Sequence, residues 1–262
     1  MTDNPFDPGY VAPEATEEEV TENVTPSALK AKREGSIRYY PDLDQGSELW
    51  LKARCGLLTA SEMKLIITPT LKIASNDKER AHLYELLAQR ITGYVEPHYF
   101  SDDMLRGQED EILAREVYHK NHAPVAGMGF ITNDKWGFTI GYSPDGLIGE
   151  HGLIECKSRR QKYQVQTIVE CVGADEIMPE YMMQCQTGML VSERHWVDHI
   201  SYSGGLPMAV VRVWPDDKIQ NAIIEAAGAF EERLAKAWTT FNETVAARRL
   251  IPTERRVEQE IF

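Results

Sequence analysis

The residues whose types and spacing could do chemistry lie together in one stretch, Ser143 to Ser158, which reads SPDGLIGEHGLIECKS. Two short apolar pieces, Leu147-Ile148 and Leu153-Ile154, are separated by the turn-forming sequence GEHG, and this pattern predicts a β-hairpin. A turn at this point folds Asp145 back towards Glu155. Two carboxylates followed by a nearby lysine indicate metal-dependent phosphodiester hydrolysis. A solvated hairpin is the ordinary alternative, because a D…E-x-K pattern also occurs by chance.

The alternation of side chains along the second strand of this hairpin decides which groups can meet. Glu155 and Lys157 point to one face, and Cys156 points into the opposite layer. Asp145, Glu155 and the carbonyl oxygen of Cys156 then form an all-oxygen set suited to Mg²⁺, with Mn²⁺ as a substitute. Lys157 would lie beside the metal and hold the attacking water or help to deprotonate it. The metal would lower the pKa of that water and neutralise charge on the phosphate.

A further carboxylate is expected from a helix over residues 102–120. One stripe of this helix is formed by Met104, Gly107, Glu111, Ala114 and Tyr118. A carboxylate among small and apolar side chains needs a partner, and the small neighbours allow close approach to another element. Glu111 could therefore reach a metal held at the hairpin. Glu109, on the other apolar flank, is the fallback, and an acid at the edge of a core helix is the ordinary explanation.

A second helix, expected over residues 179–191, carries polar groups that could face the same site. Tyr181, Gln184 and Gly188 lie on one face, so a phenol and an amide could address a metal-bound water or a phosphate from one side. A glutamine that only caps a sheet edge fits the pattern equally well. By itself this motif is weak evidence for a site.

The net charge of −13 is unusual for a protein that binds nucleic acid. The first 50 residues hold eleven acidic and four basic side chains, and the expected metal site stays negative until ions bind. The local patch matters more for DNA, and four cations fall within six positions directly after the acidic residues: Lys157, Arg159, Arg160 and Lys162. A solvated basic face is the alternative.

Composition sets the cellular context. No apolar run approaches membrane-spanning length, and the start lacks a basic and apolar leader, so we expect a cytoplasmic protein without a membrane partner. The four cysteines contain no C-x-x-C pair, which argues against a zinc ribbon or an evident iron–sulfur site. We expect them to be reduced and mostly buried thiols.

The organisation of the chain is predicted in two parts. Residues 1–40 are acidic, contain prolines and show no clear periodicity, which predicts a flexible N-terminal tail. Residues 41–262 contain neither a repeat nor a Gly/Ser linker, so we expect a single domain with a C-terminal helical segment.

Strands and helices are expected to interleave along this domain. Helical patterns lie at 76–92, 102–120, 179–191 and 216–247, and strand-like patterns at 130–140, 153–157, 196–202 and 209–214. Residues 49–67 predict a loop followed by a helix that begins near Thr59 or Ser61, either of which can cap it. The interleaving predicts an α/β or α+β domain with a central mixed sheet.

Four motifs follow one another along the chain. They are Trp50-x-x-x-Arg54-x-Gly56-x-x-Thr59-Ala60-Ser61, Gly107-x-x-x-Glu111-x-x-Ala114, Ser143-Pro144-Asp145-Gly146 with Glu155-x-Lys157, and Tyr181-x-x-Gln184-x-Gln186. In this order they resemble the phage lambda exonuclease family, the YqaJ-like viral recombinases, over roughly residues 46–247. The resemblance implies an α/β fold with a restriction-endonuclease-like core, a central mixed β-sheet flanked by helices and a PD-(D/E)xK nuclease site.

The resemblance also implies roles for the residues of the hairpin. Asp145 and Glu155 would bind catalytic Mg²⁺, the Cys156 carbonyl would complete the ligand set, and Lys157 would orient the nucleophilic water. Glu111 would serve a metal from its helix.

The second helix and the reaction follow from the same resemblance. Gln184 would support the water or the lysine. The family reaction is 5′-to-3′ hydrolysis of one strand of linear double-stranded DNA, which releases mononucleotides and leaves a 3′ single-stranded tail for annealing.

The resemblance transfers a pocket for the 5′-phosphate to Arg54, Ser61 and Ser143. An arginine fork and hydroxyls near a helix N-terminus favour a phosphate dianion, although a surface salt bridge would also explain Arg54. The family has one further arginine after the catalytic lysine. It does not align uniquely here, and the candidates are Arg159, Arg160 and Lys162.

Partners are implied by the resemblance alone. They are double-stranded DNA ends, a single-strand annealing protein and further copies of the chain in a ring, most commonly a trimer, within a bacterial host cell if the protein is phage-encoded. Two alternatives remain: another nuclease on the same core, Cas4-like or RecB-like, and a non-catalytic module that binds DNA ends. The intact acids and lysine speak against the second, because a pure binder does not need them.

Overall fold

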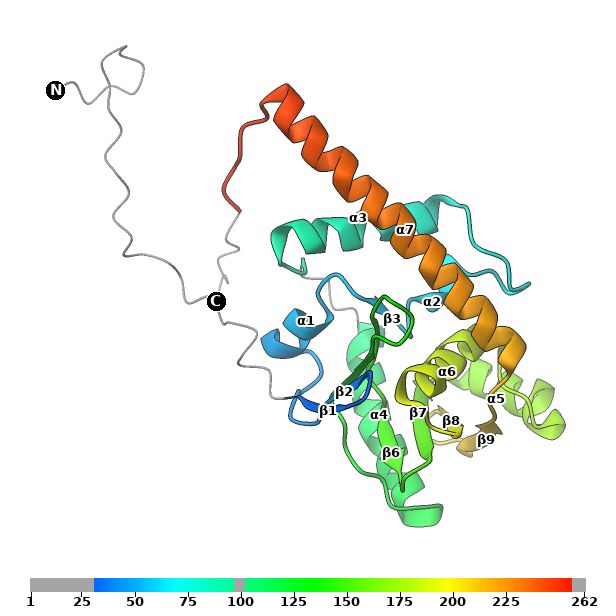
Figure 1. Cartoon of the computed structure of the whole chain (residues 1–262). Helices are drawn as coiled ribbons and strands as arrows, with labels where there is room; N and C mark the ends of the chain where they lie inside the picture. Colours follow the sequence, from blue (N-terminus) through cyan, green and yellow to red (C-terminus); the bar gives the residue numbers. More distant parts are fainter. Residues whose placement is uncertain (1–30, 97–101, 256–262) are drawn as a thin grey trace, which may run out of the picture. The chain divides into compact units, whose positions relative to one another are not determined.

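The structure is a computed structural model that describes residues 31–96 and 102–255 (Figure 1). Most of the predicted N-terminal tail lies outside the described residues. The last part of its range carries two strands, β1 (Lys32–Glu34) and β2 (Ile37–Tyr40), so the first sheet begins there. The division into a tail and a single domain stays a prediction. In the described part of the chain, no helix is long and apolar enough to cross a membrane.

The first sheet has five strands in the order β1-β2-β4-β5-β3. The strand-like pattern expected over 130–140 forms two strands, β4 (Phe130–Asn133) and β5 (Ile140–Tyr142), which pair antiparallel. Strand β3 (Leu58–Thr59) pairs parallel to β5 at the edge of the sheet. The segment that carries Arg54 and Ser61 is thereby placed beside the end of β5.

The second sheet has four strands in the order β6-β7-β8-β9 and contains the predicted hairpin. Strand β6 (Gly146–Ile148) and strand β7 (Gly152–Ser158) pair antiparallel, as the turn chemistry predicts. Strand β8 (Trp196–Tyr202) pairs parallel to β7 and antiparallel to β9 (Ala209–Val213). The expected α/β fold with mixed sheet is therefore confirmed, with the strands divided into two sheets between Tyr142 and Gly146.

Helices cover both faces of the second sheet. Helix α4 (Asp102–Asn121) contributes Ala114 and Tyr118 to a small core that also contains Cys156, while α6 (Pro179–Ser192) packs against the main core. Cys156 therefore points away from the face that carries Glu155 and Lys157, as the alternation predicts.

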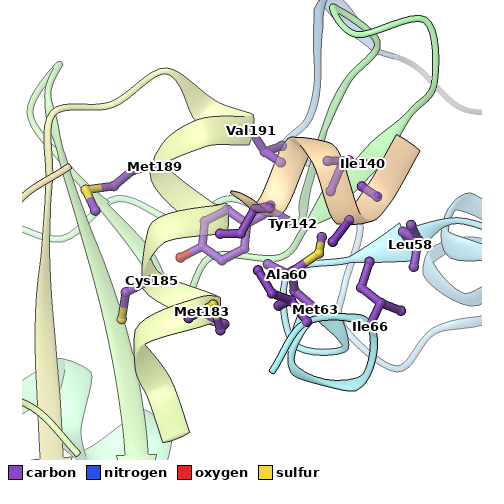
Figure 2. Packing of buried hydrophobic residues seen from close by; sticks show 14 of the residues in the cluster. Leu58, Ala60, Met63, Ile66, Ile140, Tyr142, Met183, Cys185, Met189 and Val191 are labelled. Carbon is purple, nitrogen blue, oxygen red and sulfur yellow. The ribbon is translucent and has the colours of Figure 1, made fainter. Parts of the chain in front are cut away.

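The main core surrounds α6 and draws side chains from both sheets. Figure 2 shows Met183 and Val191 of α6 on the side of β5 and of α2 (Met63–Ile66), and Cys185 and Met189 on the other side of the helix. The long helix α7 (Asp217–Arg248) closes this core with a buried apolar stripe that includes Ile223 and Phe230. The other helices are α1 (Glu48–Arg54), α3 (Asp77–Thr92) and α5 (Gln161–Glu170), with a short 3₁₀ turn at Val172–Ala174.

The predicted helix start near Thr59 or Ser61 is wrong. The structure has helix α1 in the expected loop, then strand β3, and helix α2 begins only after Glu62, whose side chain makes no capping bond. The backbone of this segment is used for sheet pairing, and Ala60 N–H donates to Gly141 O at 2.9 Å. A partner strand about eighty residues away in sequence decides this local structure, so local capping signals could not reveal it.

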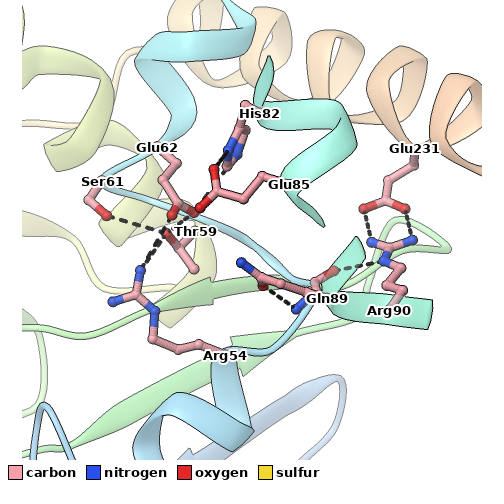
Figure 3. Close-up of polar contacts among 10 residues, drawn as sticks. Arg54, Thr59, Ser61, Glu62, His82, Glu85, Gln89, Arg90 and Glu231 are labelled. Carbon is pink, nitrogen blue, oxygen red and sulfur yellow. Dashed lines mark hydrogen bonds and ion pairs between the residues drawn. The ribbon is translucent and has the colours of Figure 1, made fainter. Parts of the chain in front are cut away.

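The loop between α1 and β3 is held by a clamp formed by Arg90 of α3 and Glu231 of α7 (Figure 3). The guanidinium donates to both carboxylate oxygens at 2.8 and 2.7 Å, and its Nε donates to Gly56 O at 2.7 Å. Gly56 has φ +71°, and a Cβ there would lie 2.5 Å from Arg90 Cγ. Gln89 Oε1 accepts from Gly56 N–H at 2.8 Å. The clamp therefore fixes the chain directly after Arg54.

We expect Glu231→Ala to lower the free energy of unfolding by about 2 kcal/mol, measured by urea denaturation, because it leaves the half-buried guanidinium without its carboxylate. The matched control is Glu193→Ala, which removes an exposed pair with Lys135 and should cost no more than about 0.5 kcal/mol. Equal losses in the two variants would show that the clamp contributes no more than a surface ion pair.

A second buried network holds helix α4 against the second sheet. The Tyr118 hydroxyl donates to Asp198 Oδ2 at 2.6 Å, and Arg212 donates to both oxygens of Asp198 at 2.7 and 2.9 Å. Tyr118 and Asp198 are 1% and 4% exposed, so both polar groups depend on these bonds. The network joins α4 to strands β8 and β9.

Candidate active site

The break between the two sheets opens into a pocket of about 220 Å³. All five residues expected to be catalytic line it: Asp145, Glu155, Lys157, Glu111 and Gln184. Three of the residues expected to bind a 5′-phosphate line the same pocket: Arg54, Ser61 and Ser143. Residues from four separate parts of the sequence therefore meet at one place.

Asp145 lies in the connection between β5 and β6, where the sheets separate. Its Oδ2 accepts the backbone N–H of Cys156 at 2.6 Å, so the hairpin does fold this carboxylate back onto β7. The side chain is only 8% exposed. Burial, together with the negative charges of Glu155 and Glu111, raises the pKa of Asp145 well above its ordinary value.

Glu155 is the most buried acid of the pocket, with 1% exposure, and both of its carboxylate oxygens accept hydrogen bonds. Oε1 accepts from Lys157 Nζ at 2.6 Å and from the side-chain amide of Gln184. Oε2 accepts from the hydroxyl of Tyr142 at 3.1 Å. Gln184 thus reaches the acids directly, whereas Tyr181 on the same helix face bonds to Arg159.

Lys157 supplies the positive charge next to the acids. Burial acts to lower its pKa, but the negative charges of Glu155 and Asp145 outweigh this effect and raise the pKa above the ordinary value. The neighbouring acids therefore favour the charged form of the ammonium group.

Glu111 reaches the pocket from α4. Its pKa is raised by burial and by the charge of Glu155, against the opposing effect of Arg115, whose Nη1 lies 4.0 Å from its carboxylate. The fallback residue Glu109 is exposed on the outside of the helix. The helix stripe therefore identified the acid that faces the pocket.

The pocket acids fit a hard divalent cation by their chemistry. Asp145, Glu155 and Glu111 bring three carboxylates into one pocket, and burial, together with the charges of neighbouring acids, raises the pKa values of Asp145 and Glu111. A bound cation would offset the charge of these carboxylates, and oxygen donors are the ligands that Mg²⁺ and Mn²⁺ prefer. In the described ranges no three His, Cys, Asp or Glu side chains already converge as a ligand set, since the acids here bond to donors of the protein.

Arg54 lines the same pocket and is held by three neighbours. Its guanidinium carbon lies 4.2 Å from the ring centre of Trp50. Its Nη2 donates to Thr59 Oγ1 at 3.2 Å, as Figure 3 shows. The same nitrogen is 3.7 Å from Glu62, whose other oxygen accepts from Thr59 at 2.6 Å. Burial lowers the pKa of Arg54 and Glu62 opposes this effect. The arginine is therefore oriented before any ligand arrives.

The two serines of the pocket are tied to the same group of residues. Trp50 Nε1 donates to Ser143 Oγ at 2.9 Å, and Ser61 Oγ lies 3.3 Å from Thr59 Oγ1. An arginine fork and two hydroxyls in one pocket are suited to a phosphate.

The three remaining phosphate candidates make other contacts and are not among the residues that line the pocket. Arg159 donates to Glu180 Oε1 at 3.1 Å, and Arg160 donates to both oxygens of Asp103 at 2.8 and 2.9 Å. Lys162 Nζ lies 4.6 Å from the centre of a neighbouring tyrosine ring. The assignment among them stays open.

Sequence reasoning missed Tyr142 and Gln45, which line the pocket, and Glu62, which pairs with Arg54. Tyr142 directly precedes the serine of the third motif, and only the pairing of β5 shows that its side chain reaches the acids. Glu62 follows the first motif and gave no separate signal. Trp50 and Thr59 were part of that motif, but nothing in the spacing revealed that they contact Arg54.

A mixed α/β core with an acidic pocket and a lysine at the end of its hairpin defines a fold of the PD-(D/E)xK nuclease type, and comparisons support this class. The crystal structure of an alkaline exonuclease, LHK-Exo, from Laribacter hongkongensis matches with a TM-score of 0.67 and 30% identity, over 77% of this chain and 99% of that chain. The structure of LHK-Exo in complex with dAMP matches with a TM-score of 0.68 and the same identity and coverage.

The sequence itself matches the model of the YqaJ-like viral recombinase domain over residues 49–195. The search of curated proteins gave no match. The chain belongs to the YqaJ-like viral recombinase family, as its four motifs indicate. All four motifs lie within the matched range.

Proposed function

We propose that the protein is a phage-type DNA exonuclease that hydrolyses the 5′-ended strand of linear double-stranded DNA in the 5′-to-3′ direction. It releases 5′-mononucleotides and leaves a 3′ single-stranded tail for annealing recombination. The observation that carries the proposal is that the acids Asp145 and Glu155, the lysine Lys157 and Arg54 line one pocket. Family membership and the likeness to alkaline exonucleases support it.

We assign the acids of the pocket to the binding of a divalent metal ion. Asp145, Glu155, Glu111 and the carbonyl of Cys156 would hold Mg²⁺, for which Mn²⁺ can substitute, and families of this kind typically use a divalent metal. When bound, the ion would supply an activated water and neutralise charge on the phosphate. The buried hydrogen bonds that fix Glu155 and Asp145 keep these oxygens in place before the ion arrives.

We assign Lys157 and Gln184 to holding and orienting the attacking water. Both donate to Glu155 Oε1, so they lie directly beside the acid whose oxygens would face the reaction. Because the ammonium of Lys157 donates to Glu155 Oε1, it would orient the water and stabilise negative charge on the phosphate.

The position of Arg54 explains why the enzyme would act at ends. A terminal phosphate bound by Arg54, Ser61 and Ser143 lies in the same small pocket as the acids, so the bond presented for hydrolysis is close to that terminus. Cleavage this close to the terminus would release a product as short as one nucleotide. The dAMP complex of LHK-Exo shows that this relative binds a nucleoside monophosphate.

The assembly and partners are proposed from the family alone. A homo-oligomeric ring, most commonly of three copies, would enclose the duplex, and a single-strand annealing protein would load on the 3′ tail in the host cytoplasm. An acidic exterior with cations facing the DNA would reconcile the net charge of −13 with binding. Sedimentation with and without duplex DNA would measure the number of copies.

The experiment that tests the reaction compares linear duplex DNA with the same DNA as a closed circle. In Mg²⁺ the linear form should be degraded to mononucleotides and the circle should stay intact, and EDTA should stop the degradation. Cleavage of the circle at a similar rate would overturn the end-dependent mechanism and favour an endonuclease of the same fold.

We expect Arg54→Ala to reduce the preference for 5′-phosphorylated over 5′-hydroxyl duplex ends by at least about tenfold, since it removes a charge-assisted bond to the phosphate. The measurement is kcat/KM on both substrates. Arg38→Ala, which removes a cation paired with Asp134 outside the pocket, is the matched control and should preserve the preference. Equal losses on both ends in Arg54→Ala would count against the phosphate pocket.

A further inference from the structure

The side chain of Tyr142 is buried beside the proposed catalytic acids, and the proposed reaction gives it no role. It ends β5, is 1% exposed and directly precedes Ser143. Figure 2 shows its ring between α6 and the side chains around Leu58, with the hydroxyl on the side away from Leu58. That hydroxyl lies 3.1 Å from Glu155 Oε2. The last residue of β5, Tyr142, therefore contacts a proposed catalytic acid, and the next residue, Ser143, is a proposed ligand of the 5′-phosphate.

The hydrogen bonds of Glu155 are unevenly divided between its two oxygens. Lys157 and Gln184 both donate to Oε1, whereas among the residues that the structure describes Tyr142 is the one recorded donor to Oε2. A carboxylate can rotate about its last carbon–carbon bond, and donors on one oxygen only restrain this rotation weakly. A donor on the second oxygen fixes the plane of the group.

The phenol ring of Tyr142 fits against α6 because residue 188 of this helix is a glycine. A Cβ at Gly188 would lie 2.7 Å from Tyr142 Cζ and 2.9 Å from Cε1, so no other residue fits there without moving the ring. Gly188 stands one helical turn after Gln184, which donates to Glu155. The same face of α6 therefore supplies one donor to the acid and the space for the other.

We propose that Tyr142 is a positioning residue for the nuclease reaction, whose hydroxyl holds the Glu155 carboxylate in the one orientation that receives the divalent cation. This inference rests on the proposed function. It concerns metal binding by Glu155, which Tyr142 would strengthen. Groups that orient a metal ligand typically change metal affinity or activity about 10- to 100-fold when removed. Tyr142 would therefore act through Glu155 and not by contact with DNA.

The test is Tyr142→Phe, which keeps the ring and removes only the hydroxyl. Mn²⁺ is titrated into the full chain without DNA, and free Mn²⁺ is followed by electron paramagnetic resonance. The expected result is a dissociation constant for Mn²⁺ at least about tenfold higher than in the wild type. The Mg²⁺ concentration for half-maximal hydrolysis should rise by a similar factor while KM for DNA stays unchanged.

Two further variants separate positioning from a general loss of packing. Tyr118→Phe removes another buried hydroxyl, which donates to Asp198 away from the pocket, and should lower the melting temperature in EDTA without changing Mn²⁺ affinity. Gly188→Ala keeps the hydroxyl and displaces the ring, so it should weaken Mn²⁺ binding in the same direction as Tyr142→Phe.

The outcomes distinguish this inference from the function on which it rests. Unchanged Mn²⁺ affinity in Tyr142→Phe overturns the role of Tyr142 and leaves the proposed nuclease standing. Absence of Mn²⁺ binding by the wild type, or undiminished binding by Asp145→Asn, overturns the metal site itself.

Discussion

Asp145→Asn should lower the rate of DNA hydrolysis by at least about 10³-fold and at the same time raise the melting temperature of the metal-free protein. The rate falls because the variant lacks one charged ligand of an ion that supplies several kcal/mol of stabilisation in the transition state. The stability rises because the amide that replaces the carboxylate brings no charge into the buried space beside Glu155 and Glu111. An effect of about 1 kcal/mol corresponds to roughly 2–4 °C in a chain of this size.

The pH dependence of this stabilisation has a definite sign. Burial and the neighbouring acids raise the pKa of Asp145 above that of the unfolded chain, so the protonated form favours folding at low pH. This contribution is lost as the pH rises through the folded-state pKa. In EDTA the wild type should therefore lose stability from acidic to neutral pH, and Asp145→Asn should lose less.

The matched control for this prediction is Asp198→Asn. Asp198 is also a buried acid, but Arg212 and Tyr118 pair with it, so its replacement should destabilise the protein by about 2 kcal/mol. Differential scanning calorimetry in EDTA measures both variants. A fall in melting temperature for Asp145→Asn would contradict the charge repulsion that we infer in the pocket.

Lys157→Met should lower the rate of hydrolysis by about 10²- to 10⁴-fold while duplex binding is retained. The substitution keeps an unbranched side chain but removes the ammonium that bonds Glu155 and would orient the attacking water. Since that ammonium also offsets the charges of Asp145 and Glu155, the variant should be less stable than the wild type in EDTA. Single-turnover hydrolysis and fluorescence anisotropy separate the rate from the binding.

Lys135→Met tests whether loss of any cation has this effect. Lys135 forms an exposed pair with Glu193, and its removal should change neither rate nor binding by more than about twofold. Should Lys157→Met keep a tenth or more of the wild-type rate, the lysine would have no direct part in the reaction.

The parts of the site that could be predicted from the sequence depend on local periodicity. The two-residue repeat of a strand placed Glu155 and Lys157 on one face and Cys156 on the other, and the hairpin turn brought Asp145 to β7. The helical repeat selected Glu111 over its neighbour. Each of these relations spans fewer than about fifteen residues, within which backbone geometry fixes side-chain direction.

The parts that could not be predicted depend on contacts between distant segments. Strand β3 forms because β5 pairs with it, which no capping signal near Thr59 could reveal. Tyr142 reaches Glu155 because Gly188 leaves space on α6. The division of the strands into two sheets, which creates the pocket between Tyr142 and Gly146, is likewise a property of the packed molecule.

The proposed function is tested most directly by one linear duplex that carries different labels at its 5′ and 3′ ends. In Mg²⁺ the 5′ label should be released first, as a mononucleotide, while the 3′ label stays on a long single strand, and EDTA should abolish the release. Earlier release of the 3′ label, or release of the 5′ label only on long fragments, would contradict a 5′-to-3′ exonuclease.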